Sequence, residues 1–127
     1  MPKTLSEDKR LTHVTLIALS LPEVKRELHG SHATFLVRKK PFAYYLDNHH
    51  GDGIVGITCK VLPGENQSLV ETQPERFYPP AYLVSRGWVA LRLDRGKIDW
   101  REVKELLSGS YAMIAPKRLA EQVVSNL

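Results

Sequence analysis

A chain of 127 residues in which 43% of the side chains are hydrophobic and 25% are charged has the composition of an ordinary globular protein, which excludes extended disorder. The length fits one folded domain that spans residues 1–127. A chain of this length can form one hydrophobic core that needs no disulfide bond or bound metal to stabilise it. The 18 Lys+Arg and 14 Asp+Glu give a net charge of +4, which favours polyanionic partners only where the cations gather on one face.

The same features indicate a cytoplasmic protein without a membrane segment. No apolar run reaches the roughly 18 residues that a membrane helix needs, and no apolar stretch of a signal peptide follows the first residues. Cys59 has no second cysteine to pair with, and its apolar neighbours favour a small core residue in a reducing compartment.

The first predicted element is a helix from Thr4 to about Leu19. Thr4 and Glu7 have the spacing of a capping box, and apolar residues recur at helical intervals from Leu11 to Ala18. Leu21-Pro22 ends this helix, because proline interrupts helical hydrogen bonding.

Antiparallel strands are predicted next. A short strand over Glu23 to Leu28 leads through the turn formers Gly30-Ser31 into an alternating run from Ala33 to Val37. After Lys39-Lys40-Pro41, the aromatic-rich run from Phe42 to Leu46 completes a hairpin.

A further strand is predicted beyond the polar turn 47–53. The run from Ile54 to Leu62 places Val55, Ile57, Cys59 and Val61 on one face. Pro63 suits the first position of a short helix that reaches about Thr72 and ends at Pro74. The segment from Phe77 to Tyr82 is expected to be irregular, because its two prolines lack hydrogen-bond donors.

The last part of the chain predicts one strand and two helices. Trp88 to Leu93 alternates in hydrophobicity and ends at the turn 94–96. Asp99 and Glu102 repeat the capping-box spacing and begin a helix that Ser108-Gly109 is expected to close. A final helical segment is predicted within 111–127, with Pro116 near its start.

Several short segments, taken in order, resemble the MmcQ/YjbR family. They are Leu21-Pro22-Glu23-Val24, Lys40 before Phe42-Ala43, Lys60 with Pro63-Gly64, Tyr78-Pro79-Pro80-Ala81-Tyr82, Gly87-Trp88-Val89, Asp99-Trp100, and Ser110-Tyr111 leading to Ala115-Pro116-Lys117. The resemblance covers about Leu5 to Ala120, and the turn from His49 to Gly53 looks like one branch of that family.

The resemblance implies an α/β (α+β) fold with an antiparallel sheet of about five strands and helices packed mainly on one face, similar to CyaY-like or secretion-chaperone-like domains. It also implies DNA binding through a pair of wing-like hairpins. Function transfers less well than fold, so the residues themselves must carry the functional hypothesis.

Basic and aromatic residues on one sheet face favour nucleic-acid binding. Strand alternation places Trp88 and Arg92 opposite Val89 and Leu91, where cations can meet phosphates and a ring can meet bases. The candidate contacts are Arg38, Lys39, Lys40, Lys60, Arg86, Trp88, Arg92 and Lys117. In the alternative interpretation Trp88 packs under the segment 79–82 and the lysines are solvated surface.

The histidine-rich turn is more typical of a polar hairpin turn than of a metal site. His49, His50 and Asp52 carry metal-ligand chemistry, but neighbouring histidines on a strand point to opposite sides, so no metal or cofactor is predicted. The candidate pocket residues are His49, His50, Asp52, Tyr82 and Trp88. No motif supplies an activated nucleophile, so no catalytic residue is assigned and the sequence leans away from an enzyme.

The sequence therefore favours a non-enzymatic domain that binds DNA weakly. A protein-interaction or chaperone-like role for an aromatic patch of Tyr78, Tyr82 and Trp88 stays open, as does a small-molecule or metal site at His49-His50. The sequence does not fix the oligomeric state. Any site is expected where the segments 49–52 and 78–88 meet.

Overall fold

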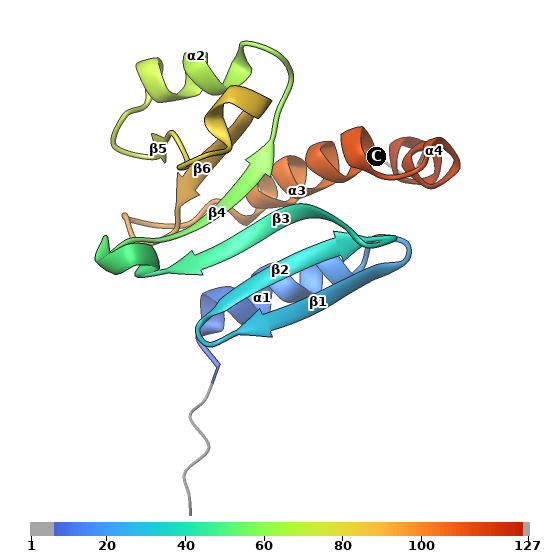
Figure 1. The fold of residues 1–127 in the computed structure, drawn as a ribbon, viewed down its shortest axis with the longest axis horizontal. Coiled ribbons are helices and arrows are strands. Elements are labelled where there is room, and N and C mark those ends of the chain that lie inside the picture. The colour runs from blue at the N-terminus through green and yellow to red at the C-terminus, as the bar shows by residue number, and fades with distance from the viewer. Residues whose placement is uncertain (1–6, 126–127) are drawn as a thin grey trace, which may run out of the picture.

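A six-stranded antiparallel sheet organises the computed structural model, which describes residues 7–125 (Figure 1). Every neighbouring pair of strands is antiparallel, in the order β1-β2-β3-β4-β6-β5. The strands are β1 (Val24–His29), β2 (His32–Val37), β3 (Lys40–Asp47), β4 (Val55–Lys60), β5 (Phe77–Tyr78) and β6 (Trp88–Arg92). The predicted fold class is confirmed, with one more short strand than expected.

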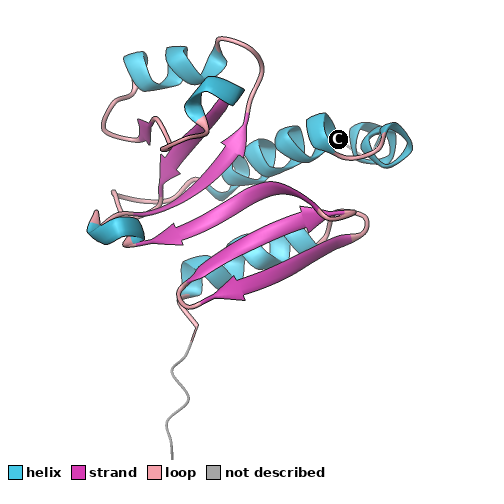
Figure 2. Ribbon diagram, viewed as in Figure 1, coloured by secondary structure: helices cyan, strands magenta, loops and turns pink. Residues whose placement is uncertain are grey.

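Helices cover one face of this sheet over most of its width. The helices of the described residues are α1 (Lys9–Leu19), α2 (Glu65–Thr72), α3 (Trp100–Ile114) and α4 (Lys117–Ser125), with two short 3-10 turns, η1 (His49–Gly51) and η2 (Val84–Arg86). Figures 1 and 2 show α1 and α3 behind the sheet, whereas α2 packs against β5 and β6 at its far edge. The face turned away from α1 and α3 is called the open face below.

The core lies between the sheet and these two helices because side chains alternate along each strand. Phe35, Ile57 and Leu91 point inward from β2, β4 and β6, and they are at most 4% exposed. Val14 of α1 and Leu107 of α3, both 0% exposed, pack against them in one hydrophobic cluster. Cys59 belongs to this cluster, as the sequence predicted.

The helix α3 does not close at Ser108-Gly109, so that prediction is wrong. Ser110 is 0% exposed, and its hydroxyl donates to Phe42 O (2.6 Å) and accepts from Lys60 N (2.9 Å). The helix therefore continues across the sheet to satisfy these groups, while Gly109 faces open space. It ends at Ile114 because Pro116 forces Ala115 into an extended conformation (φ −66°, ψ 157°).

Two further boundaries differ from the sequence prediction. The first helix begins at Lys9, where the Asp8 carboxylate accepts from Arg10 N (2.8 Å) and caps it, and Thr4 lies outside the described residues. The N-cap of α2 is Gly64, so Pro63 precedes the helix instead of opening it.

The segment 77–82 is also less irregular than expected. Phe77 and Tyr78 form β5, because Pro79 favours an extended residue before it and an edge strand tolerates the prolines that follow.

In the described residues, no helix combines the length and apolar character that crossing a membrane requires.

Candidate functional site

A row of paired residues crosses the open face of the sheet. Tyr44 on β3 pairs with Thr58 on β4, Thr58 pairs with Ala90 on β6, and Ala90 pairs with Tyr78 on β5. Gly56 lies on the same face as Thr58, since side chains of alternate residues share a face. Small residues therefore form the floor at the middle of this face, and a tyrosine stands on either side.

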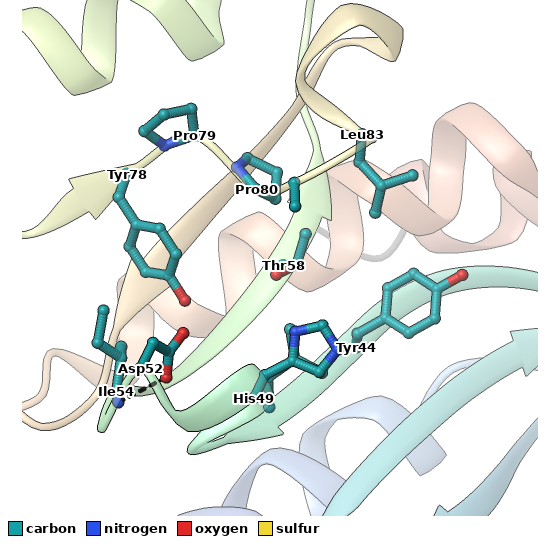
Figure 3. A pocket seen from close by; sticks show the side chains of 11 residues that line it. Tyr44, His49, Asp52, Ile54, Thr58, Tyr78, Pro79, Pro80 and Leu83 are labelled. Carbon is teal, nitrogen blue, oxygen red and sulfur yellow. Dashed lines mark hydrogen bonds between the residues drawn. The ribbon is translucent and has the colours of Figure 1, made fainter.

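Tyr44, Thr58 and Tyr78 of this row line a cavity of about 430 Å³, which we call the open-face cavity (Figure 3). Most of its wall is apolar and consists of Leu46, Ile54, Pro79, Pro80, Ala81 and Leu83. The cavity lies where the turn 49–52 meets the segment 78–83. A concave and mainly apolar site with a few polar groups is the usual form of a small-molecule site.

His49 and Asp52 bring polar groups to the mouth of the open-face cavity. His49 lies in η1, and its ring meets that of His32 edge-on, with centroids 5.5 Å apart. The Asp52 carboxylate accepts from Ile54 N (2.9 Å), which fixes its position beside the cavity. Figure 3 shows Asp52 and Tyr78 on one side of the cavity, and His49 and Tyr44 on the other.

Thr58 contributes a buried hydroxyl group at the floor. The residue is 1% exposed, and its Oγ1 has no hydrogen-bond partner in the part of the chain that the structure describes. Figure 3 shows it at the back of the cavity between Tyr78 and Tyr44. A buried hydroxyl without a partner costs about 1–3 kcal/mol, and such groups are rare in proteins.

Burial keeps the hydroxyl group of Tyr78 protonated. Burial raises the pKa of Tyr78, and the negative charge of Asp52 raises it further. Tyr78 is therefore a neutral donor at physiological pH.

The remaining candidate groups for chemistry are not placed for it. Cys59 alternates with Thr58 and points into the core, and burial raises its pKa to about 12. Across residues 7–125, no group of three His, Cys, Asp or Glu side chains is placed to hold a metal ion.

A second feature is a concentration of cations at the end of the sheet where β2 and β4 end and β3 and β6 begin. Its members are Arg38, Lys39, Lys40, Lys60, Arg86 and Lys117, and we call this group the basic end. Arg38 and Lys39 form the turn between β2 and β3, and both have positive φ (48° and 71°). Positive φ at both central residues is the backbone of a type I′ hairpin turn, which favours Asn-Gly over bulky side chains.

The basic end is held in place by specific contacts. Arg38 donates to both carboxylate oxygens of Glu23, at 2.8 and 3.0 Å, and these bonds, with a contribution from Arg118, lower the pKa of Glu23. Val61 N donates to Gly87 O (3.0 Å), so Lys60 and Arg86 are neighbours that border one hollow of about 660 Å³.

Lys117 lies at this end because its neighbour Arg118 is close enough to Glu23, the partner of Arg38, to act on its charge. Ser110 links α3 to β3 and β4, and Lys117 opens α4 just after α3 ends. Among the described residues, no salt bridge involves Lys39, Lys40, Lys60 or Arg86.

Trp88 and Arg92 are placed differently from the other candidate nucleic-acid contacts. Trp88 is 7% exposed and borders a hollow with Asn66 and Val70 of α2 and with Pro79, which leaves little of its ring for a base. Arg92 lies at the opposite end of β6, where it forms a bidentate pair with Asp94 (3.0 and 3.1 Å).

A family model described as YjbR matches residues 19–113, which is more than half of the 127 residues. The chain belongs to the YjbR family. A solved structure of the Deinococcus radiodurans protein DR2400, whose family-model domain is DUF419, has the same fold as this YjbR protein. The two superpose with a TM-score of 0.68 at 20% identity, over 90% of this chain and 87% of the other. No curated protein matches this chain.

In this YjbR-family chain, the candidate pocket residues do not all reach the cavity. His49 and Asp52 line it, whereas Tyr82 is 89% exposed and Trp88 lies in the neighbouring hollow. The side chain of His50 lies outside what the structure describes.

The sequence reasoning missed the floor of the cavity. Thr58 is chemically ordinary, and its place between Tyr44 and Tyr78 comes from the strand order β3-β4-β6-β5, which a single sequence does not reveal. One signal was present in this YjbR protein: the polar Thr58 alternates with the apolar Ile57 and Cys59 in a run that is otherwise buried.

Proposed function

We propose that this YjbR-family protein binds nucleic acid through its basic end, without sequence preference. One observation carries the proposal: four separate segments of the chain contribute cations to the same end of the sheet. A net charge of +4 becomes a phosphate-binding surface only when cations gather in this way.

The type of contact follows from the side chains. Lys39, Lys40 and Arg86 are exposed, and lysine and arginine at such sites bind phosphate oxygens rather than base edges. Arg38 holds the turn through Glu23 and so positions Lys39 and Lys40. With Trp88 buried, Tyr82 is the exposed aromatic on the same loop as Arg86, and it can stack on an unpaired base.

The aromatic-patch alternative has weaker support. Tyr82 is 89% exposed and has a positive φ of 66°, but Trp88 is buried and Tyr78 borders the open-face cavity. The three aromatic residues therefore do not form one exposed patch, which a protein-interaction surface would need.

Fluorescence anisotropy with a short labelled DNA duplex tests the proposal. We expect binding that weakens as salt rises from about 50 mM to 200 mM, with a slope of about 0.9 per phosphate contact in a plot of log K against log salt. The variant K39A/K40A/R86A loses those contacts, so its slope falls by about 2–3 and its affinity at low salt drops at least tenfold.

A matched control separates position from net charge. The variant R95A/K97A/K104A removes the same number of positive charges from exposed residues outside the basic end. We expect it to bind DNA nearly as the parent does. Equal losses in both variants, or no binding by the parent at low salt, would overturn the proposal.

A further inference from the structure

We propose that the open-face cavity binds a small planar molecule that is neutral or cationic and carries an N–H donor. The proposal rests on the cavity alone and is independent of nucleic-acid binding at the basic end. Three properties of the cavity carry it: the shape and apolarity of its walls, the buried hydroxyl at its floor, and the sign of its charge.

The walls select a flat apolar body. Tyr44 and Tyr78 stand on opposite sides of a floor at Thr58, and Pro79 and Pro80 close the rim. These side chains are stiff, so the space of about 430 Å³ is largely preformed. A space of this size accommodates one aromatic ring system with a short substituent.

The floor requires a polar partner. Thr58 Oγ1 is buried and unpartnered within the described residues, and a hydroxyl can both donate and accept a hydrogen bond. Valine would fill the same space without the polar group. The unpartnered hydroxyl therefore costs stability. Its oxygen has almost no accessible surface, so a small shift of the surrounding side chains admits a ligand's polar atom, and the new hydrogen bond recovers that free energy.

The charge of the cavity selects against anions. Asp52 lines it, and none of the described residues that line it is a lysine or arginine. Arg92, whose charge acts on Tyr78 and Asp52, is already paired with the Asp94 carboxylate. One oxygen of Asp52 is held by Ile54 N, which leaves acceptor capacity on the carboxylate for an N–H group of the ligand. The tyrosine rings add attraction for a cation, so phosphates and carboxylates are disfavoured and amines are favoured.

Three probes with the same indole ring test this selection by NMR. Tryptamine carries a cationic side chain, tryptophol a neutral one, and indole-3-acetate an anionic one. We expect tryptamine to bind with a Kd of about 1 mM or below, and to shift the backbone resonances of Tyr44, Thr58 and Tyr78. Tryptophol should bind about threefold more weakly, and indole-3-acetate more weakly still.

Two variants test the assigned contacts. Thr58→Val should weaken tryptamine binding about threefold to tenfold and, at the same time, raise the melting temperature by roughly 3–5 °C. Asp52→Asn should remove the preference for tryptamine over tryptophol. A purely structural role of Thr58 would not move stability and binding in opposite directions.

Each of the two variants has a matched control. Thr34→Val alters a threonine on the same row, outside the cavity, and Glu105→Gln removes a carboxylate from α3 on the other side of the sheet. Both should bind the probes as the parent does.

Three outcomes would overturn the proposal. They are a failure of every probe to shift resonances at the cavity, binding of indole-3-acetate as tight as that of tryptamine, and unchanged binding by Thr58→Val. DNA binding by Thr58→Val should stay at the parent level, so the two proposals can fail separately.

Discussion

The hydroxyl group of Tyr78 lies over the backbone of Gly56: a β-carbon at position 56 would be 3.5 Å from that oxygen and 2.6 Å from Leu91 O. The second distance is far shorter than side-chain carbons tolerate, and its partner is backbone in the neighbouring strand β6. Glycine at this position therefore allows β4 and β6 to pair normally while Tyr78 reaches over the floor of the open-face cavity.

Gly56→Ala should destabilise the protein. The added methyl group must push β4 away from Leu91 O, and overpacking of this kind costs about 1–3 kcal/mol. This cost exceeds the gain of about 0.4–1 kcal/mol that alanine brings by restricting the unfolded chain. Urea denaturation measures the difference, and tryptamine binding should weaken in the same variant.

Gly109→Ala is the control for that experiment. Gly109 lies inside α3, and a β-carbon there would meet no atom within 4 Å. Alanine is a better helix former than glycine, so this variant should be more stable by about 0.5–1 kcal/mol. Equal effects of the two substitutions would contradict the close approach at Gly56.

Lys39 should be replaceable by glycine with a gain in stability and a loss in DNA affinity. Its φ of 71° is unfavourable for a residue with a β-carbon by about 1 kcal/mol, and glycine removes that cost. Glycine also removes the cation, so the salt dependence of DNA binding should decrease by about one phosphate contact.

Lys39→Ala separates the two effects, because it removes the charge but keeps the β-carbon. We expect it to lose DNA affinity as Lys39→Gly does, without the gain in stability seen by thermal unfolding. A strained turn that displays cations is typical of a functional position. An unchanged DNA affinity in both variants would show that this turn is outside the nucleic-acid surface.

The strand pattern was readable from the sequence because hydrophobic alternation reports which face of a strand is buried. Phe35, Ile57, Cys59 and Leu91 were expected inside, and all are. The helix end at Ser108-Gly109 was misread, since small polar residues favour termini when nothing buries them. Ser110 is buried because Phe42 O and Lys60 N, far away in the chain, supply its partners.

The candidate site was predictable only in outline. The expectation that the segments 49–52 and 78–88 meet did not identify the residues between them, because Gly56, Thr58 and Ala90 have no distinctive chemistry. Trp88 shows the opposite problem. Strand alternation correctly placed it on the open face, but the helix α2, which covers it there, could not be placed from the sequence.

Asp94 should make stability sensitive to acid. The hydrogen bonds from Arg92 lower the pKa of Asp94, and a bond from Val55 N contributes. A carboxyl whose pKa is lower in the folded state stabilises the protein above its unfolded pKa of about 4 and loses that contribution as pH falls through the folded pKa.

Asp94→Asn should therefore cost about 1 kcal/mol at pH 7, and this difference should shrink below about pH 4. Urea denaturation across this pH range measures it. Glu105→Gln removes an exposed carboxylate from α3 and should leave stability unchanged at every pH. A loss at pH 7 that persists unchanged in acid would contradict an ionic origin.

Cys59 should be inert toward thiol reagents in the folded protein. It is 1% exposed, and burial raises its pKa to about 12, so the reactive thiolate is nearly absent at pH 8. Because the folded pKa is raised, the thiol favours folding below its unfolded pKa of about 8.5 and loses that effect as pH rises toward 12. Reaction with Ellman's reagent at pH 8 should be at least about a thousandfold slower than in urea, since it requires unfolding.

A Ser31→Cys variant is the control, because it adds an exposed thiol in the turn between β1 and β2. It should show one fast and one slow equivalent. Fast release of a full equivalent by the folded parent protein would mean that β4 opens to solvent far more readily than its buried position implies.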